Sequence, residues 1–332
     1  MEPGPASLEP AVGVADEASV EVSDEVALEV AVEVAVEVAD EAAEDLAEEA
    51  QDRLPTRPGL SPSRAHDFEQ CPLLFRFRVV DRLPEPTSDA AARGTLVHSV
   101  LEHLFDLPAA ARTPEAALAA LPGEWELLRA SAPAYGELFA TAEQEQTWLG
   151  TAEALLTSYF TLEDPTRLEP AERELHVRTD LVDGPQLRGI VDRLDVAPNG
   201  WIRVVDYKTG RAPREGYEGQ ALFQMRFYAY VVWQNRGVLP RLLQLVYLAS
   251  GTVLRHEPTE AEMRTLEARV RALWAQVQQT ARTGRWNPRQ SALCGWCSFR
   301  DLCPAFGGTP PPVDAEAVVR ALGVRPEPAA AL

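Results

Sequence analysis

The sequence almost lacks lysine. Of its 31 basic residues, thirty are arginines and one is a lysine, Lys208. A chain that otherwise uses arginine is expected to keep lysine where the position needs an ammonium on a flexible stem and not a planar guanidinium. Lys208 stands in Val-Val-Asp-Tyr-Lys-Thr-Gly, two residues after Asp206. It is therefore a candidate functional residue.

The sequence also lacks a hydrophobic run long enough to span a membrane, and its start lacks the basic and apolar pattern of a signal peptide. We therefore expect a cytoplasmic protein with no membrane partner. A P-loop requires Gly-x-x-x-x-Gly-Lys. The only lysine follows Tyr207, which excludes a P-loop helicase motor within these 332 residues.

Basic residues are missing from residues 1–52, which hold seventeen Asp and Glu and an alternating Val, Ala and Glu repeat. This composition predicts a disordered, acidic, low-complexity tail over 1–57. It acts either as a solvated tail or as an autoinhibitory arm that competes with nucleic acid. Residues 53–332 hold the other 34 acidic residues and all 31 basic residues, thirty arginines and one lysine, which gives a net charge of −3. A nearly neutral remainder leaves room for a local basic groove.

The hydrophobic periodicity predicts an α/β fold with a mixed sheet over residues 58–306, followed by a Pro/Ala-rich C-terminal tail at 307–332. A first helix begins at Ser61 or Ser63, and residues 113–163 form a helical insertion. The other expected elements are a helix over 94–105, strands over 172–180, 187–197 and 201–208, a helix over 217–235, a strand within 241–255 and a helix over 259–282.

A turn at 197–200, Ala-Pro-Asn-Gly, predicts a hairpin centred on Asn199 that places Asp192 opposite Asp206. Opposed side chains lie roughly 5 Å apart at Cβ, so two carboxylates there destabilise the pair unless a cation lies between them. The alternative is an exposed hairpin end at which Lys208 bridges the acids. Strict alternation places the following on one face: Ile190, Asp192, Leu194, Val196, Ile202, Val204, Asp206 and Lys208.

Four short motifs resemble those of the PD-(D/E)XK nuclease superfamily, in its RecB-like branch, and stand in that family's order. They are Gly94-Thr-Leu-Val-His98, Gly189-Ile-Val-Asp192-Arg, Asp206-Tyr-Lys208-Thr-Gly and Gln224-Met-Arg-Phe-Tyr228. The resemblance implies a restriction-endonuclease-like mixed central sheet flanked by helices. It covers about residues 60–305.

The resemblance also implies the residues of a metal site. Asp192 and Asp206 bind Mg²⁺ or Mn²⁺, which favour oxygen ligands. His98 adds a nitrogen ligand, and the backbone carbonyl of Tyr207 contributes a further oxygen. Glu174 on the preceding strand is a candidate accessory acid.

The remaining implied roles concern catalysis. Lys208 orients the attacking water and stabilises charge in the transition state, because two adjacent carboxylates keep its ammonium protonated. Gln224 and Tyr228 lie on one face of a helix at i, i+4, where they shape the site or hold the DNA backbone.

Cysteine is scarce: Cys71 stands alone, and Cys294, Cys297 and Cys303 cluster near the end of the fold. Four thiols suit one metal centre, two disulfides do not suit a cytoplasmic protein, and structural zinc usually uses two close pairs. Zinc and unliganded thiols stay open as alternatives. The one-plus-three arrangement resembles the iron–sulfur clasp of AddB-type and CRISPR-associated RecB-like exonucleases, which implies a 4Fe–4S cluster bound by Cys71 and the 294–303 segment.

Arginines alternate with aromatic residues around these cysteines, a composition that suits single-stranded nucleic acid. For Trp296, between two cysteines, packing against the metal centre is the favoured interpretation. The residues concerned are Arg76, Arg78, Arg82, Arg285, Trp286, Arg289, Trp296 and Arg300.

Together these features predict a metal-dependent deoxyribonuclease, an exonuclease on single-stranded DNA or frayed ends that acts in DNA repair or recombination, with a separate helicase where it meets long duplexes. Three alternatives stay open: a non-catalytic DNA-binding subunit of a helicase–nuclease complex, a CRISPR spacer-acquisition nuclease, and a zinc-stabilised interaction module.

Overall fold

A mixed β-sheet forms the centre of the protein, whose computed structural model describes residues 57–214 and 219–327. The strand order is β1-β3-β4-β5-β6, and β2 pairs with the other edge of β3. The β1–β3 and β4–β5 pairs are parallel and the others antiparallel. The strands of the described residues are β1 (Gly59–Leu60), β2 (Glu172–Asp180), β3 (Gln186–Val196), β4 (Ile202–Lys208), β5 (Leu242–Tyr247) and β6 (Thr252–His256).

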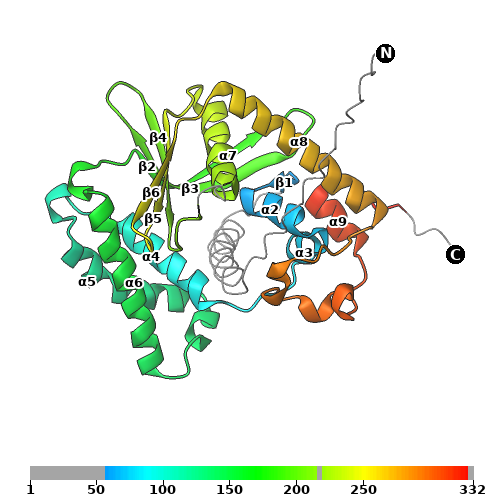
Figure 1. Ribbon diagram of the computed structural model, residues 1–332, viewed down its shortest axis with the longest axis horizontal. Coiled ribbons are helices and arrows are strands. Elements are labelled where there is room, and N and C mark those ends of the chain that lie inside the picture. The colour runs from blue at the N-terminus through cyan, green and yellow to red at the C-terminus, as the bar shows by residue number, and fades with distance from the viewer. Residues whose placement is uncertain (1–56, 215–218, 328–332) are drawn as a thin grey trace, which may run out of the picture.

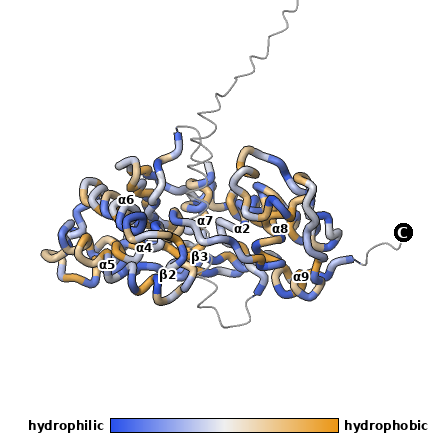
Figure 2. Tube along the Cα trace, turned by 90° about the horizontal axis from the view of Figure 1, so that it is seen from below, coloured by the Kyte–Doolittle hydropathy of each residue, from blue (hydrophilic) through white to orange (hydrophobic). Residues whose placement is uncertain are grey.

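Helices cover both faces of this sheet (Figure 1). Viewed from below, α4, α5 and α6 lie to one side of the strands, and α2, α8 and α9 to the other (Figure 2). The helices are α2 (Pro62–Gln70), α3 (Pro72–Phe75), α4 (Asp89–Leu104), α5 (Pro114–Ser131), α6 (Ala142–Leu162), α7 (Gly219–Arg236), α8 (Glu260–Thr283) and α9 (Ala315–Leu322). Within the described ranges, no helix is long and apolar enough to cross a lipid bilayer.

The sheet separates two hydrophobic cores, one on each of its faces. The larger core joins α2, α3, α7, α8 and α9 to one face of the sheet, with Leu194, Val204 and Leu245 among its strand residues. The smaller joins α4, α5 and α6 to Val205, Tyr207 and Val246 on the other face. Alternation along β4 and β5 thus divides neighbouring residues between the two cores. The predicted α/β class with a mixed central sheet is confirmed.

Local signals in the sequence set most of the element boundaries. Ser61 caps α2, because its hydroxyl accepts a hydrogen bond from the Arg64 amide at 3.3 Å. Thr259 and Glu262 form a capping box at the start of α8, and the helix ends at Gly284, whose φ of 65° suits glycine. The alternating stretch predicted as one strand within 241–255 forms two strands, β5 and β6, because Gly251 turns the chain between them at φ 60°.

The ends of the described chain differ from the prediction in one respect. The predicted C-terminal tail at 307–332 includes α9, whose Val318 and Leu322 are fully buried in the larger core. Figure 1 shows α9 beside α2 and α3, so both ends of the described fold meet. In the sequence, flanking prolines obscure the apolar stripe of this short helix. The predicted tail over 1–57 lies almost wholly outside the described residues.

Candidate active site

The sheet forks beside β3. On one edge of β3, β1 pairs with residues 186–187 and β4 pairs with residues 193–196. Among the described strands, none pairs with residues 188–192 on that edge. A gap therefore opens between β3 and the end of β4 that carries Asp206 and Lys208.

Three carboxylates lie in one row at the fork. The predicted hairpin register is confirmed by the pairs Arg193–Val205 and Leu194–Val204, and one further step places Asp192 opposite Asp206. On the other edge of β3, Glu174 of β2 lies opposite Asp192, because the residues on either side of it pair with Arg193 and Val191. Acidic residues thus occupy the same row on β2, β3 and β4, an arrangement that is unfavourable without a compensating cation.

Both β2 and β3 change face at this row. Val191 packs in the larger core, yet Arg193, two residues later, reaches Glu163 and Phe105 on the α4 side. On β2, Glu174 has a left-handed φ of 42°. The predicted strict alternation from Ile190 to Val196 is therefore wrong at Asp192. The strained backbone of Glu174 is of the kind that functional sites retain.

Asp192 lies in the gap. It is 4% exposed, and its Oδ2 accepts a hydrogen bond of 2.6 Å from the backbone amide of Tyr207. Burial raises the pKa of Asp192 well above its ordinary value, and the carboxylates of Asp206 and Glu174 raise it further. Burial also raises the pKa of Glu174; His98 opposes this shift, and Glu102 and Asp206 add to it. Burial and the neighbouring carboxylates thus oppose ionisation of both groups when no cation is present.

His98 on α4 reaches the same place. Its Nε2 lies 3.0 Å from the carbonyl oxygen of Tyr207. Since a carbonyl only accepts hydrogen bonds, Nε2 carries the proton, and a neutral ring then has a free lone pair on Nδ1. Nδ1 lies 3.7 Å from Asp192 Oδ2. Ligand atoms of His98, Glu174 and Asp192 all lie within 4.8 Å of one another.

Asp206 and Lys208 form the other end of the site. Lys208 Nζ lies 3.2 Å from Asp206 Oδ2, and both side chains are almost fully buried. Within the described residues, neither oxygen of Asp206 accepts a hydrogen bond. Buried carboxylate oxygens normally have such partners. The donor set of one imidazole and several carboxylates, with oxygens left for a ligand, fits a divalent cation.

Gln224 and Tyr228 on α7 pack behind the fork. The Gln224 amide donates a hydrogen bond of 3.2 Å to the Tyr228 hydroxyl, and both residues are about 1% exposed. The Tyr228 ring lies against Gly189, where an added Cβ would come within 2.6 Å of it. The glycine of the Gly189–Arg193 motif therefore allows α7 to approach β3 three residues before Asp192.

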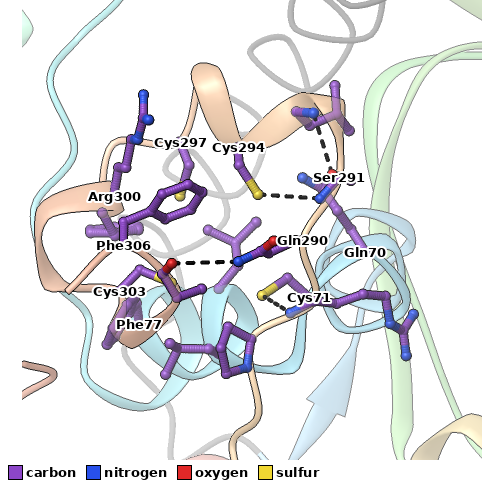
Figure 3. A pocket seen from close by; sticks show the side chains of 17 residues that line it. Gln70, Cys71, Phe77, Gln290, Ser291, Cys294, Cys297, Arg300, Cys303 and Phe306 are labelled. Atoms are coloured by element: carbon purple, nitrogen blue, oxygen red, sulfur yellow. Dashed lines mark hydrogen bonds between the residues drawn. The ribbon is translucent and has the colours of Figure 1, made fainter. Parts of the chain in front are cut away.

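The four cysteines line one pocket between α3 and the chain after α8 (Figure 3). The backbone amides of Arg289 and Ser291 approach the sulfurs of Cys71 and Cys294, both at 3.4 Å. All four thiols are described, and no three of their sulfurs lie within 4.8 Å of one another. Segments more than 200 residues apart in sequence thus present their thiols to a shared space.

Three of the residues predicted to contact nucleic acid around this pocket pair or pack within the protein instead. Arg76 pairs with Asp81, and Arg78 pairs with Asp67 and Glu85. Trp286 is buried and stacks on Phe75 at 6.3 Å. Trp296, by contrast, is 54% exposed, so the favoured interpretation of it as a packed residue is wrong.

Comparison with known proteins agrees with this architecture. Residues 59–304 match the sequence profile of the PD-(D/E)XK nuclease superfamily. The chain belongs to this superfamily. Its mixed sheet flanked by helices is the restriction-endonuclease-like fold of PD-(D/E)XK nucleases, which are hydrolytic enzymes that use divalent metal ions.

Individual relatives of this PD-(D/E)XK protein are distant. The Gene 69 protein of Mycobacterium phage L5 is 28% identical over 128 residues, which are 38% of this chain and 42% of the phage protein. The chain thus spans less than half of that relative. A candidate exonuclease from Eubacterium rectale has a solved structure that is similar with a TM-score of 0.49 at 15% identity, over 77% of this chain and 91% of that one.

Proposed function

We propose that this protein is a divalent-metal-dependent deoxyribonuclease of the RecB-like branch. The observation that supports this most is the carboxylate row of Glu174, Asp192 and Asp206 at the fork, with His98 beside it and Lys208 at its end. Asp192 and Asp206 are buried and Glu174 is half-buried, and such a row of like charges is costly in a protein that does not use it. A site that holds a cation against a phosphodiester accounts for that cost.

The ligands are the carboxylates of Asp192 and Asp206 and Nδ1 of His98. Glu174 joins them as an additional ligand, because its carboxylate shares the geometric cluster with His98 and Asp192. The Tyr207 carbonyl holds the His98 ring and keeps a second lone pair that can also face the ion. Carboxylates with one imidazole suit Mg²⁺ or Mn²⁺, and the nitrogen shifts the preference toward Mn²⁺.

When bound, such an ion lowers the pKa of a coordinated water and polarises the phosphate. Lys208, whose ammonium pairs with Asp206, orients the attacking water and stabilises the negative charge of the transition state. Tyr228, hydrogen-bonded by Gln224, packs α7 against Gly189 of β3, and the two residues would shape the site from behind.

We also propose that Cys71, Cys294, Cys297 and Cys303 bind a 4Fe–4S cluster. Cys71 lines one pocket with the three cysteines of the 294–303 segment, and this one-plus-three arrangement supports the proposal. The cluster would clasp the chain after α8 onto α3, and its role is structural.

The substrate is DNA, and we propose exonuclease action on single strands or frayed ends in repair or recombination within the cytoplasm. A separate helicase would supply single strands from long duplexes. The nuclease domain comprises residues 58–306 with the insertion at 113–163, and α9 completes it. The exposed Trp296 and the nearby Arg285 and Arg300 are candidate contacts to the strand.

The deciding experiment compares wild type, Lys208→Ala and Arg264→Ala on end-labelled single-stranded DNA with Mg²⁺ or Mn²⁺, after anaerobic purification. Arg264 is the control, because it is an exposed basic residue of α8 that pairs with Glu260. Metal-dependent cleavage that Lys208→Ala loses and Arg264→Ala keeps supports the proposal. Equal cleavage by all three proteins would place the activity elsewhere. No cleavage by folded wild type would favour a binding subunit.

A further inference from the structure

Tyr207 connects the two halves of the candidate metal site through its backbone. Its amide donates to Asp192 Oδ2 at 2.6 Å, and its carbonyl oxygen lies 3.0 Å from His98 Nε2. One peptide segment therefore orients two proposed ligands at once. A rotation of this segment would move the Asp192 carboxylate and the His98 ring together.

The side chain of Tyr207 lies in the smaller core, edge-on to the His98 ring at 6.2 Å, and is held at its far end. Its hydroxyl accepts a hydrogen bond from Nη1 of Arg193, and the guanidinium lies 5.5 Å from the centre of the Tyr207 ring. The ring also packs edge-on against Tyr159 at 5.7 Å. Tyr207 is therefore fixed at both its backbone and its hydroxyl.

Arg193 is itself locked by a bidentate ion pair. Its two terminal nitrogens lie 2.8 and 2.9 Å from the Glu163 oxygens, and Gln244 donates to the same carboxylate at 2.8 Å. Arg193 is 1% exposed. Two parallel hydrogen bonds fix a guanidinium in direction as well as in place.

The charges of this network balance without the acid row. Arg193 Nε lies 3.2 Å from Asp195 Oδ1, and Asp195 pairs with Arg203 at 2.7 Å. Two arginines thus meet two carboxylates, Glu163 and Asp195. Arg193 follows Asp192 in sequence, but its charge is paired with Glu163 and Asp195. It therefore does not serve as the counter-ion of Asp192.

Glu163 comes from the helical insertion, as the C-cap residue of α6. We propose that the Glu163–Arg193 pair, acting through the Tyr207 hydroxyl, positions the Asp206-Tyr207-Lys208 segment and so sets the metal affinity of the active site. Glu163, Arg193 and the Tyr207 side chain are positioning residues. This inference rests on the proposed metal-dependent function.

The test is Tyr207→Phe, which removes the anchoring hydroxyl and keeps the ring and the peptide. The control is Tyr230→Phe, because Tyr230 is a buried tyrosine whose hydroxyl bonds Glu267 on α8 at 3.0 Å. Calorimetric titration of the full chain with Mn²⁺ reads out binding directly. Loss of an outer partner of a metal ligand typically weakens binding about 10–100-fold, so Tyr207→Phe should raise the Kd by that factor and Tyr230→Phe should leave it unchanged.

A Kd for Tyr207→Phe equal to that of wild type would overturn the positioning role while leaving the metal site intact. No Mn²⁺ binding by wild type, or equal binding by Asp192→Asn, would instead overturn the proposed metal site and the inference with it. The two failures are thus distinguishable.

Glu163→Gln gives a second, independent reading. If the pair acts only through the Tyr207 hydroxyl, the double variant Glu163→Gln/Tyr207→Phe should have the same Kd for Mn²⁺ as the single variant with the higher Kd. Multiplicative losses in the double variant would show two independent effects and overturn the relay. Circular dichroism at the titration temperature confirms that each variant is folded.

Discussion

The backbone amide of Tyr207 donates a 2.6 Å hydrogen bond to the side chain of Asp192 across the gap where β3 and β4 separate. A carboxylate here takes the place of a strand partner. The bond fixes the direction of Asp192 before any ligand arrives, which reduces the reorganisation that metal binding requires. The fork in the sheet is therefore the structural origin of the site.

Asp192→Asn should separate stability from function. The amide oxygen can still accept from the Tyr207 amide, but the buried charge beside Asp206 and Glu174 is gone. We expect the metal-free variant to melt at a higher temperature than metal-free wild type. Mg²⁺ should raise the melting temperature of wild type alone, and DNA cleavage should fall roughly 100-fold or more. A variant that Mg²⁺ stabilises as strongly as wild type would contradict this site.

Lys208→Arg tests why the chain keeps one lysine. The substitution conserves charge, but the side chain is 2% exposed and a planar guanidinium is larger than the ammonium. Steady-state cleavage should fall nearly as far for Lys208→Arg as for Lys208→Ala, with thermal melting as a check on folding. Activity near that of wild type would show that only the positive charge matters.

The sequence predicted the hairpin well because turn chemistry and alternation are local. Asn199 and Gly200 set the register that pairs Leu194 with Val204, and this register brings Asp192 opposite Asp206. The face change at Asp192 could not be predicted, because it depends on how β2 and β3 bend together at Glu174. The left-handed φ of Glu174 has no local sequence signal, since glutamate rarely adopts it.

The contacts that hold the site could not be predicted from the sequence for a similar reason. Arg193 and Glu163 are thirty residues apart, and only the packing of α6 on the sheet brings them together. One weak signal existed: Arg193 follows Asp192 within a buried strand, where an arginine needs a partner. The identity of that partner required the three-dimensional structure.

Glu163→Gln should also change how stability depends on pH. Burial opposes ionisation of Glu163, but hydrogen bonds and charge from Arg193 outweigh it, so the pKa is lowered from 4.5. A carboxyl group whose pKa is lowered by folding stabilises the folded protein above the pKa it has in the unfolded chain. This stability is lost as pH falls through the pKa of the folded state. Metal-free wild type should therefore lose stability below about pH 4.5 more steeply than Glu163→Gln.

At neutral pH the same substitution should cost about 3–5 kcal/mol, because it breaks a buried ion pair. Urea denaturation in EDTA at a series of pH values measures both effects. Glu153→Gln is the control, since Glu153 lies on the exposed side of α6. Parallel pH curves for wild type and Glu163→Gln would show that this carboxylate is not held ionised by Arg193.

Cys303→Ser tests the proposed cluster. Protein purified anaerobically should contain about four irons and four sulfides per chain, and the variant should lose them. Releasing the long loop between Cys71 and the C-terminal cysteines should lower stability by on the order of 4 kcal/mol. Ser298→Ala is the control, as an exposed hydroxyl beside Cys297. Zinc in place of iron, with one ion per chain, would contradict the cluster.

Trp296→Ala should weaken the binding of single-stranded DNA. Trp296 is 54% exposed between two cysteines, and Arg285, Arg289 and Arg300 on the same segment are exposed. Stacking of one base on an aromatic ring contributes about 1–3 kcal/mol, which corresponds to a Kd increase of roughly 5- to 150-fold. Fluorescence anisotropy with a labelled oligonucleotide in Ca²⁺ measures it.

Trp201→Ala supplies the matched control for this measurement, because Trp201 is 57% exposed at the tip of the β3–β4 hairpin. Its loss removes an exposed tryptophan ring that lies beside one arginine, Arg241, rather than beside three. An equal effect of both substitutions would indicate nonspecific adhesion of exposed tryptophan. An effect confined to Trp201→Ala would place the DNA path at the hairpin tip. A loss confined to Trp296→Ala would extend the DNA path to the cysteine segment, giving this segment a binding role besides its structural one.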